Sequence, residues 1–381
     1  MDSPLPRNGT LAIVTAPYRE KHASGGQPRV RGKWCARRAV LRLIGWQKAR
    51  VEGMMQGKVA LEEHFAIAET AADSMNYFPE PVRSEVAGRN ADIHGRRLSL
   101  MDQYGIELML LSLNAPAVQA IPDRARAGEV ARIANDYLAE QVQKRPERFQ
   151  GLAALAMQDP DGAAREVERC VKQLGFRGAL VNGFSQTGDA DAILYYDLPQ
   201  YRPFWATVER LDVPFYLHPR NPLPRDARIY DGHPWLLGPI WAFGQETAVH
   251  ALRLMASGLF DAHPRLQIIL GHMGENLPYG MWRVDHSNAW IPNRNKWPAK
   301  KKLAEYFSAN FYLTTSGNFR TQALINAMLE IGADRIMFST DWPFENIDHA
   351  ANWFDHCAIS ENDRTKIGRT NARRLFKLGN D

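Results

Sequence analysis

Charged residues end an apolar stretch near the start of the main body of the chain. Residues 57–66 read GKVALEEHFA, so a β-type apolar run continues directly into Glu62, Glu63 and His64. Side chains alternate between the two faces of a strand, which puts Glu62 and His64 on one face and Glu63 on the other. Burying two carboxylates and an imidazole is unfavourable unless a cation or hydrogen bonds compensate. The pattern therefore predicts a chemical role for Glu62 and His64, and it predicts that Glu63 faces away and pairs with surrounding side chains.

More polar residues end the later apolar runs of the chain: Asn182, His218, His272 and Asp341. A single histidine at such a place is usually a satisfied core or loop group, and a single aspartate usually caps the next helix. Several such residues at strand ends that share one barrel mouth must lie close together. Two imidazoles and two carboxylates form a suitable donor set for one divalent cation. The predicted metal ligands are Glu62, His64, His218 and Asp341.

Eight short apolar runs have to position these residues. They cover residues 58–66, 107–115, 149–157, 176–183, 213–219, 266–274, 310–317 and 335–343. Helical patterns separate the runs, for example over 128–146 and 161–175, and a last helix is expected over 361–378. Apolar strands that alternate with helices are typical of a closed parallel sheet, so the predicted fold class is α/β, a (β/α)8 TIM-type barrel. A doubly wound sheet is the competitor, but no Gly-x-Gly-x-x-Gly follows the first run.

The charge distribution separates a basic leader from the rest of the chain. The 381 residues have a formal net charge of +5, and residues 1–54 hold 11 Lys and Arg against 3 Asp and Glu. The remainder is mildly acidic, so no nucleic-acid surface is predicted on it. The leader is similar in composition to a transit peptide or to a basic amphipathic helix over 36–48, or it is translated from an early start upstream of Met54 and Met55. Residues 1–54 are expected to lie outside the fold, and residues 55–381 to form one barrel domain.

Cysteine usage and hydropathy indicate a cellular compartment. Cys35, Cys170 and Cys357 lie far apart and show no CxxC or CxxH spacing, which fits a reducing cytoplasm. No apolar run approaches the ~18 residues that a membrane span requires. We therefore expect a cytoplasmic protein without a membrane segment.

Long segments of the body resemble one branch of the amidohydrolase superfamily. They include GKVALEEHFAI, LSLNAPAVQAIPD, PFYLHPRNPLP and FSTDWPFENIDHA, and the resemblance spans residues 55–381 but not the leader. That superfamily usually has His-x-His in its first strand, where this chain has Glu62-x-His64, and no lysine ends the fourth strand at LVNG. Both departures imply one metal ion, Zn²⁺ or Mn²⁺, and not two. The branch is that of the hydroxybenzoate decarboxylases, and within it the segments resemble the gamma-resorcylate (2,6-dihydroxybenzoate) decarboxylases.

The resemblance implies roles for particular residues. The implied catalytic residues are Asp341, His272 and Glu275, and the implied substrate contacts are Arg283, Asn182 and Asn288. Alternatives stay open, because Glu275 could merely occupy the first turn of a helix and Arg283 could form a surface ion pair. Aromatic loop residues are expected to wall a pocket for an aromatic acid or to contact other subunits: Tyr77, Phe78, Trp235, Trp241, Phe243 and Phe344.

The implied reaction is the reversible, non-oxidative decarboxylation of a dihydroxybenzoate, the 2,6 isomer giving resorcinol and carbon dioxide. Direct loss of carbon dioxide would leave a very basic aryl anion, so protonation of the carboxyl-bearing carbon comes first, with Asp341 as the acid. The rivals are a mononuclear metal hydrolase, a decarboxylase of 2,3-dihydroxybenzoate or salicylate, and a non-enzymatic protein that binds acidic surfaces through its leader. The expected partners are a small aromatic carboxylate and further copies of the chain in a homotetramer.

Overall fold

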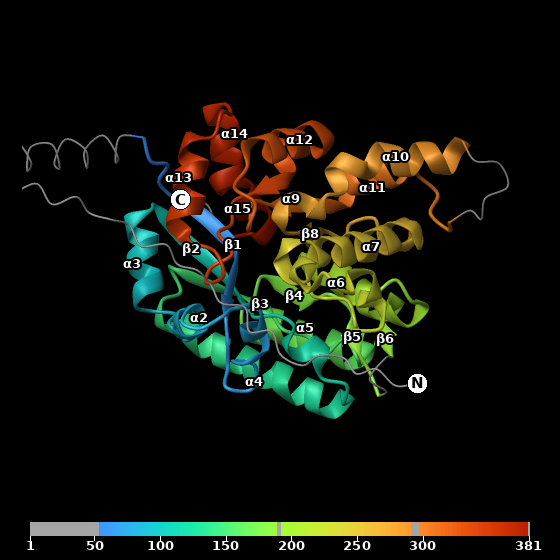
Figure 1. Ribbon diagram of the computed structural model, residues 1–381, viewed down its shortest axis with the longest axis horizontal. Coiled ribbons are helices and arrows are strands. Elements are labelled where there is room, and N and C mark those ends of the chain that lie inside the picture. Colours follow the sequence, from blue (N-terminus) through green and yellow to red (C-terminus); the bar gives the residue numbers. More distant parts are fainter. Residues whose placement is uncertain (1–52, 189–191, 291–296, 380–381) are drawn as a thin grey trace, which may run out of the picture. The chain divides into compact units, whose positions relative to one another are not determined.

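The computed structural model describes residues 53–188, 192–290 and 297–379, as drawn in Figure 1. Within these ranges the side chains of Asn76 and Tyr77 are not described. The predictions for the leader, including the amphipathic helix over 36–48, therefore lie outside the described residues, apart from Gly53 and Met54 at its end. All described residues belong to the compact unit that begins at Gly53.

Eight parallel strands form the barrel that the sequence predicts. Hydrogen-bonded neighbours follow the order β1-β2-β3-β4-β7-β8-β9-β10. Their bounds are β1 (Lys58–Phe65), β2 (Ile106–Leu113), β3 (Phe149–Ala153), β4 (Gly178–Asn182), β7 (Phe215–His218), β8 (Ile268–Leu270), β9 (Phe311–Thr314) and β10 (Ile336–Met337). A separate antiparallel pair consists of β5 (Ser185–Gln186) and β6 (Ile193–Leu194). The predicted α/β barrel is thus confirmed, with each strand inside or within one residue of its predicted run.

Helices surround the strands (Figure 1). The α-helices are α2 (Val82–Ala91), α3 (Arg96–Gln103), α4 (Arg124–Lys144), α5 (Pro160–Gln173), α6 (Arg202–Leu211), α7 (Ala242–Ala256), α8 (Leu259–Ala262), α9 (His272–Glu275), α10 (Leu277–Trp290), α11 (Leu303–Asn310), α12 (Thr321–Ile331), α13 (Ile347–His356), α14 (Glu361–Thr365) and α15 (Asn371–Phe376). The 3-10 turns are η1 (Asp73–Tyr77), η2 (Ala117–Ala120), η3 (Pro199–Tyr201), η4 (Asp226–Tyr230), η5 (Pro234–Leu236), η6 (Gly238–Ile240) and η7 (Ala333–Arg335). Within the described ranges, no helix is both long and apolar enough to cross a membrane.

Periodic apolar residues explain why the helices pack on the barrel. In α5 the buried positions are Ala163, Val167 and Cys170, a spacing of four and three residues that makes one apolar face. In α4 the carboxylate of Asp123 accepts a hydrogen bond from the backbone N–H of Arg126 and so caps the first turn. Both helices were predicted from this periodicity, and their observed ends differ from the prediction by four residues or fewer.

The last helix differs from its prediction. Residues 361–378 were expected to form one helix, but a π-helical turn, η8 (Lys366–Thr370), separates α14 from α15. The carbonyl of Ile367 accepts a hydrogen bond from the backbone N–H of Phe338, just after β10. Gly368 lies against Met55, whose sulfur would be 2.5 Å from an added Cβ. We attribute the wider π-helical turn to these contacts with the strand ends. The helical pattern of the sequence does not reveal such contacts.

The apolar interior has two layers. The inner layer takes residues from all eight strands, and α15 adds to it at one end: Val59, Leu61, Leu108, Leu110, Leu152, Leu180, Tyr216, Ile269, Tyr312, Met337, Ala372 and Phe376. The outer layer packs the opposite strand faces against the helices. Because the inner layer fills the cylinder, only the strand ends and the following loops are free to form a site.

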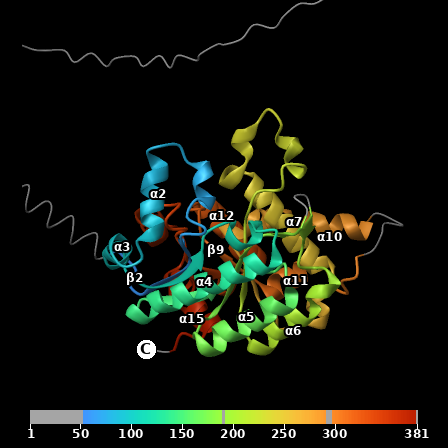
Figure 2. The same cartoon turned by 90° about the horizontal axis from the view of Figure 1, so that it is seen from below.

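Two long excursions rise from one side of the barrel (Figure 2). The first follows β1 and carries η1 and α2, and the second follows β7 and carries the turns η4, η5 and η6. They leave β1 and β7 at their carboxyl ends, where barrel enzymes hold their active sites. These excursions are therefore the natural walls of a site at that mouth.

A buried ion pair at the start of β1 yields a stability prediction. The ammonium of Lys58 lies 2.9 Å from the Asp355 carboxylate, and the two side chains are 0% and 4% exposed. Removing one charge leaves the other buried without its partner, so Asp355→Asn should lower the free energy of unfolding by about 3 kcal/mol. Urea unfolding of the metal-free protein at pH 7 measures the change. A loss below about 1 kcal/mol would contradict the role assigned to this pair.

Candidate metal centre

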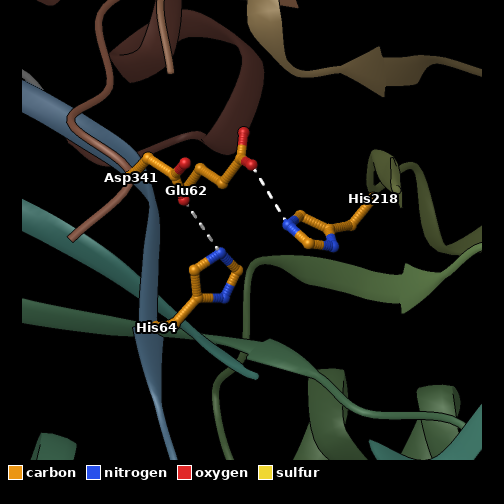
Figure 3. Close-up of side chains that lie close together, drawn as sticks. All are labelled: Glu62, His64, His218 and Asp341. Carbon is orange, nitrogen blue, oxygen red and sulfur yellow. Dashed lines mark ion pairs between the residues drawn. The ribbon is translucent and has the colours of Figure 1, made fainter. Parts of the chain in front are cut away.

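Four polar side chains from three separate places in the chain meet at the mouth of the barrel (Figure 3). Glu62 and His64 come from β1, His218 ends β7, and Asp341 follows β10. One ligand atom of each lies within 4.8 Å of the others. His218 Nε2 is 3.2 Å from Glu62 Oε1, and His64 Nε2 is 3.5 Å from Asp341 Oδ1. The predicted convergence of these four residues is thus observed.

A bulge in β1 turns Glu62 and His64 toward this centre. Ala60 pairs with Met109 of β2, but Glu63 pairs with Leu111, so β1 contains one residue more than β2 over this stretch. Strict alternation from the inward-facing Leu61 would send Glu62 outward. The extra residue reverses the faces, because a bulge re-aims the side chains that follow it. Glu62 and His64 consequently face the barrel mouth and Glu63 faces away, as its hydrogen bonds beyond β10 show.

Buried atoms without partners show that a cation fits here. Among the described residues, Glu62 Oε1 and His64 Nε2 are buried and accept no hydrogen bond from the protein. Such atoms are strongly unfavourable when nothing pairs with them. Two imidazole nitrogens and two carboxylate oxygens suit Zn²⁺ and Mn²⁺ alike. The donor set therefore fits one divalent ion held between the four side chains.

Neighbouring hydroxyl groups hold two of these side chains in place. The Tyr216 hydroxyl donates to Glu62 Oε2 and lies 2.9 Å from Thr314 Oγ1, which leaves Oε1 facing the centre. Ser112 Oγ lies 3.2 Å from His64 Nδ1, which leaves Nε2 facing the centre. Burial raises the pKa of Tyr216 well above its ordinary value, so the phenol keeps the proton that it donates. Such partners fix the orientation of metal ligands.

The charges of Glu62, Asp341 and His218 match what a cation requires. Burial raises the pKa of Glu62, but the neighbouring imidazoles, His272 foremost, outweigh it and bring this pKa well below the ordinary value. Burial also raises the pKa of Asp341, but the nearby imidazoles of His272 and His64 outweigh it and bring this pKa below the ordinary value. Burial lowers the pKa of His218. The carboxylates are therefore anionic and His218 is neutral, the forms in which these groups bind metals.

His272 and Glu275 occupy an unusual turn directly after β8. Residues 272–276 all have φ between 51° and 83°, so the segment labelled α9 is a left-handed turn. Left-handed backbone costs roughly 1–2 kcal/mol for each residue with a side chain, and such strain is concentrated at functional sites. The turn brings His272 Nδ1 to 2.7 Å from Glu275 Oε1. Glu275 therefore holds His272, as predicted, and does not simply occupy the first turn of a right-handed helix.

The other ring nitrogen of His272 faces the centre. Its Nε2 is 3.6 Å from Glu62 Oε1 and 3.7 Å from Asp341 Oδ2. Burial lowers the pKa of His272, but the carboxylates of Glu275 and Glu62 outweigh it and raise this pKa well above the ordinary value. A Cβ added at Gly317 would lie 2.8 Å from His272 Cδ2, so only glycine lets the ring lie this close to the chain. His272 is thus a positively charged group beside the predicted metal ligands.

A cavity of about 280 Å³ opens over the centre. Polar side chains line part of it, among them His218, His272, Asp341 and Arg220, and Phe78, Phe243, Phe344 and several prolines line much of the remainder. The rings of Phe78 and Phe344 stack with centroids 6.1 Å apart and planes 4° from parallel. A flat aromatic molecule with one anionic edge fits such a cavity. Phe78, Phe243 and Phe344 are therefore wall residues, as predicted.

The other predicted pocket residues whose side chains are described do not line this cavity. Trp235 is 61% exposed and Trp241 49%, and neither lines this cavity. Asn182 is buried at the end of β4, where its amide donates to the carbonyl of Asn114. Arg283 is exposed and Asn288 partly exposed on α10, away from the cavity lining of this single chain. The side chain of Tyr77 lies outside the described residues. Substrate contacts by Asn182, Arg283, Asn288 and Tyr77 remain predictions.

Sequence reasoning missed several residues of the site. Tyr216, Ser112 and Gly317 were not predicted, although they support Glu62, His64 and His272. A signal existed for Tyr216, since it precedes His218 by two residues and therefore faces the same side of β7. No comparable signal marks Ser112 or Gly317, because their contacts come from distant parts of the chain.

The contact of Tyr216 with Glu62 yields a prediction about metal binding. Tyr216→Phe removes the hydroxyl that fixes Glu62, so the dissociation constant for Mn²⁺ should rise about tenfold or more. Titration of the metal-free protein, followed by the electron paramagnetic resonance of free Mn²⁺, measures this constant. Tyr312→Phe is the matched control, because Tyr312 also belongs to the inner layer but lies under Arg335. Equal affinities of the two variants would contradict the role of Tyr216.

Comparisons with known proteins agree with this geometry. The Amidohydrolase family model matches residues 62–378. Gamma-resorcylate decarboxylase of Rhizobium radiobacter is 71% identical over 324 residues, covering 85% of this chain and 99% of that relative. A crystal structure of 2,6-dihydroxybenzoate decarboxylase complexed with 2,6-dihydroxybenzoate is 71% identical, with a TM-score of 0.84 over 85% of this chain and 100% of that one. A dihydroxybenzoic acid decarboxylase from Polaromonas sp. JS666, solved with manganese and the inhibitor 2-nitroresorcinol, is 69% identical, with a TM-score of 0.84 over 86% and 98%. This chain therefore belongs to the amidohydrolase family.

Proposed function

We propose that this protein is a carboxy-lyase that converts 2,6-dihydroxybenzoate reversibly to resorcinol and carbon dioxide with one divalent metal ion per chain. The observation that carries the proposal is the cluster of Glu62, His64, His218 and Asp341 at the polar side of an aromatic cavity. The 71% identity to gamma-resorcylate decarboxylase over nearly all of that relative supports the choice of substrate. Zn²⁺ and Mn²⁺ both suit the donor set, and manganese occupies the similar Polaromonas structure.

Glu62, His64, His218 and Asp341 would hold the metal ion, which would supply positive charge that stabilises an anionic substrate. The stacked rings of Phe78 and Phe344 orient the flat substrate in the cavity. The imidazolium of His272, held by Glu275, adds a second positive charge beside it. These groups stabilise the anionic substrate in its bound state.

Asp341 is the proposed acid. Protonation of the carboxyl-bearing ring carbon allows carbon dioxide to leave without forming an aryl anion, and departure of carbon dioxide restores aromaticity. The low pKa of Asp341 in the ligand-free chain arises from His272 and His64. An anionic substrate in the same cavity raises this pKa, because like charges disfavour the ionised form. Binding of substrate thus favours the protonated acid that the reaction consumes.

Exposed apolar side chains support the proposal of a homotetramer. Tyr279 is 90% exposed, Trp282 68% and Trp290 76% on α10, and Leu329 is 82% exposed on α12. Large apolar side chains gathered on two neighbouring helices are typical of contacts between subunits. Light scattering coupled to size-exclusion chromatography measures the assembly. A cytoplasmic location and a small aromatic carboxylate as substrate complete the proposal.

The role of Asp341 gives a direct test of the reaction. Asp341→Asn removes the acid but keeps a side chain of the same size, so turnover should fall by about 10³-fold while 2,6-dihydroxybenzoate still binds. Carbon dioxide release and resorcinol formation measure turnover, and calorimetric titration measures binding. Asp355→Asn, far from the cavity, should retain turnover. Near-normal activity of Asp341→Asn would remove Asp341 from the acid role.

Removal of the metal tests the cofactor. Dialysis against a chelator should abolish decarboxylation, and one equivalent of Mn²⁺ or Zn²⁺ per chain should restore it. Metal analysis by mass spectrometry, together with assays on the 2,6 and 2,3 isomers and on salicylate, identifies the ion and the preferred substrate. Full activity of a chain shown to be free of metal would contradict the proposal. Hydrolysis of esters or lactones without carbon dioxide release would favour a hydrolase.

A further inference from the structure

Glu63 lies where the barrel closes, between β10 and β1. The strand ladder runs from β1 round to β10, and irregular hydrogen bonds join the two ends. The backbone N–H of Glu62 donates to Ser339 Oγ at 2.7 Å, and that of His64 donates to the carbonyl of Trp342 at 2.6 Å. Residues 339–342 are therefore held against the end of β1 largely by contacts outside a regular sheet.

The carboxylate of Glu63 provides most of the other contacts across this seam. Its Oε1 accepts hydrogen bonds from Ser339 Oγ at 3.2 Å and from the backbone N–H of Thr340 at 2.8 Å. Its Oε2 accepts from Thr340 Oγ1 at 2.5 Å and from the backbone N–H of Trp342 at 3.3 Å. Two of the four donors are the backbone N–H groups of Thr340 and Trp342, the residues directly before and after Asp341. One side chain thus holds the chain on both sides of a predicted metal ligand.

The backbone of Asp341 needs such support. Its φ is 63°, in the left-handed region that residues with a side chain rarely adopt. Such a conformation persists only where the surroundings determine it strongly. The Trp342 N–H that Glu63 binds belongs to the peptide plane that follows Asp341, and the Thr340 N–H belongs to the peptide plane between Ser339 and Thr340. Together these two bonds restrain the chain on both sides of Asp341 and thus the direction in which its carboxylate leaves the chain.

A buried arginine completes the arrangement on the opposite side. Arg97, in α3, is fully buried and donates to the carbonyl of His64 through Nη2 at 2.5 Å. Its positive charge interacts with the carboxylate of Glu63. A buried carboxylate is tolerated when a cation and several donors compensate its burial. Glu63 and Arg97 together therefore tie the β1 ligands to the Asp341 segment.

We infer that Glu63 is a positioning residue that sets the placement of Asp341 relative to Glu62 and His64, and thereby both the affinity of the metal centre and the reactivity of the acid. The catalytic half of this inference rests on the proposed function, whereas the metal-binding half does not. Glu63 touches neither the cavity nor the four ligand atoms, so it acts only through the chain that it holds.

Glu63→Gln tests the inference in the full-length protein. The backbone N–H groups of Thr340 and Trp342 bind different oxygens of Glu63, so the amide would present its NH2 group, which cannot accept, to one of them. The dissociation constant for Mn²⁺ should rise at least about tenfold, and kcat for 2,6-dihydroxybenzoate at saturating Mn²⁺ should fall about tenfold or more with KM little changed. The spectrum of bound Mn²⁺ should also change, because one ligand is misplaced. Paramagnetic resonance and steady-state kinetics supply these readouts.

Asp355→Asn is the matched control for lost stability. It removes a buried carboxylate of α13 that pairs with Lys58 at the other end of β1, so the midpoint of unfolding should fall while Mn²⁺ affinity, kcat and the bound Mn²⁺ spectrum stay the same. If Glu63→Gln does not fold, Glu63→Asp takes its place, since it keeps two acceptor oxygens but withdraws them by one methylene. The same loss of Mn²⁺ affinity is expected from it.

The outcomes separate this inference from the proposed function. Weaker Mn²⁺ binding in the Glu63 variant than in the control supports a positioning role, even if the unaltered protein releases no carbon dioxide. Loss of stability with unchanged Mn²⁺ affinity and spectrum overturns that role and leaves Glu63 a purely structural residue. Absence of decarboxylation by the unaltered, metal-loaded protein overturns the proposed function alone.

Discussion

The site depends on one electrostatic constraint. Two carboxylates and two imidazoles are buried together, and no cationic side chain of the described residues pairs with all four of them. Within the part of the chain that the structure describes, Glu62 Oε1 and His64 Nε2 face a shared centre without a hydrogen-bond partner. In an apolar surrounding such an arrangement is strongly unfavourable, and a divalent ion removes the cost. The same ion provides the charge that an anionic aromatic substrate needs. One metal ion would therefore both stabilise the fold at this site and take part in the chemistry.

The barrel accommodates this burial through several departures from regular structure. A bulge in β1 turns Glu62 and His64 inward. A left-handed turn after β8 brings His272 and Glu275 together, and Asp341 itself has a positive φ. Each departure is unfavourable locally, and each is stabilised by specific contacts from distant parts of the chain. The regular strands thus bring the site residues to the mouth of the barrel, and the irregular segments set the final positions of their side chains.

This division explains what could be predicted from the sequence. Apolar runs and helical periodicity predicted eight strands in order, and the polar residues at their ends predicted the four-residue cluster, because strand ends in a barrel must meet. The inward direction of Glu62 depends on the bulge, and alternation alone cannot show where an extra residue falls. The π-helical turn at Lys366–Thr370 and the support from Tyr216 and Gly317 likewise arise from tertiary contacts. The predicted contact of Arg283 with the substrate stays a prediction, because this residue lies exposed on α10 and does not line the cavity.

Anomalous X-ray diffraction at the manganese edge, from crystals of the protein loaded with Mn²⁺, tests the metal centre most directly. We expect one strong peak per chain, within bonding distance of Glu62, His64, His218 and Asp341. A peak located away from these side chains, or two peaks bridged by them, would contradict a single ion held at this end of the barrel.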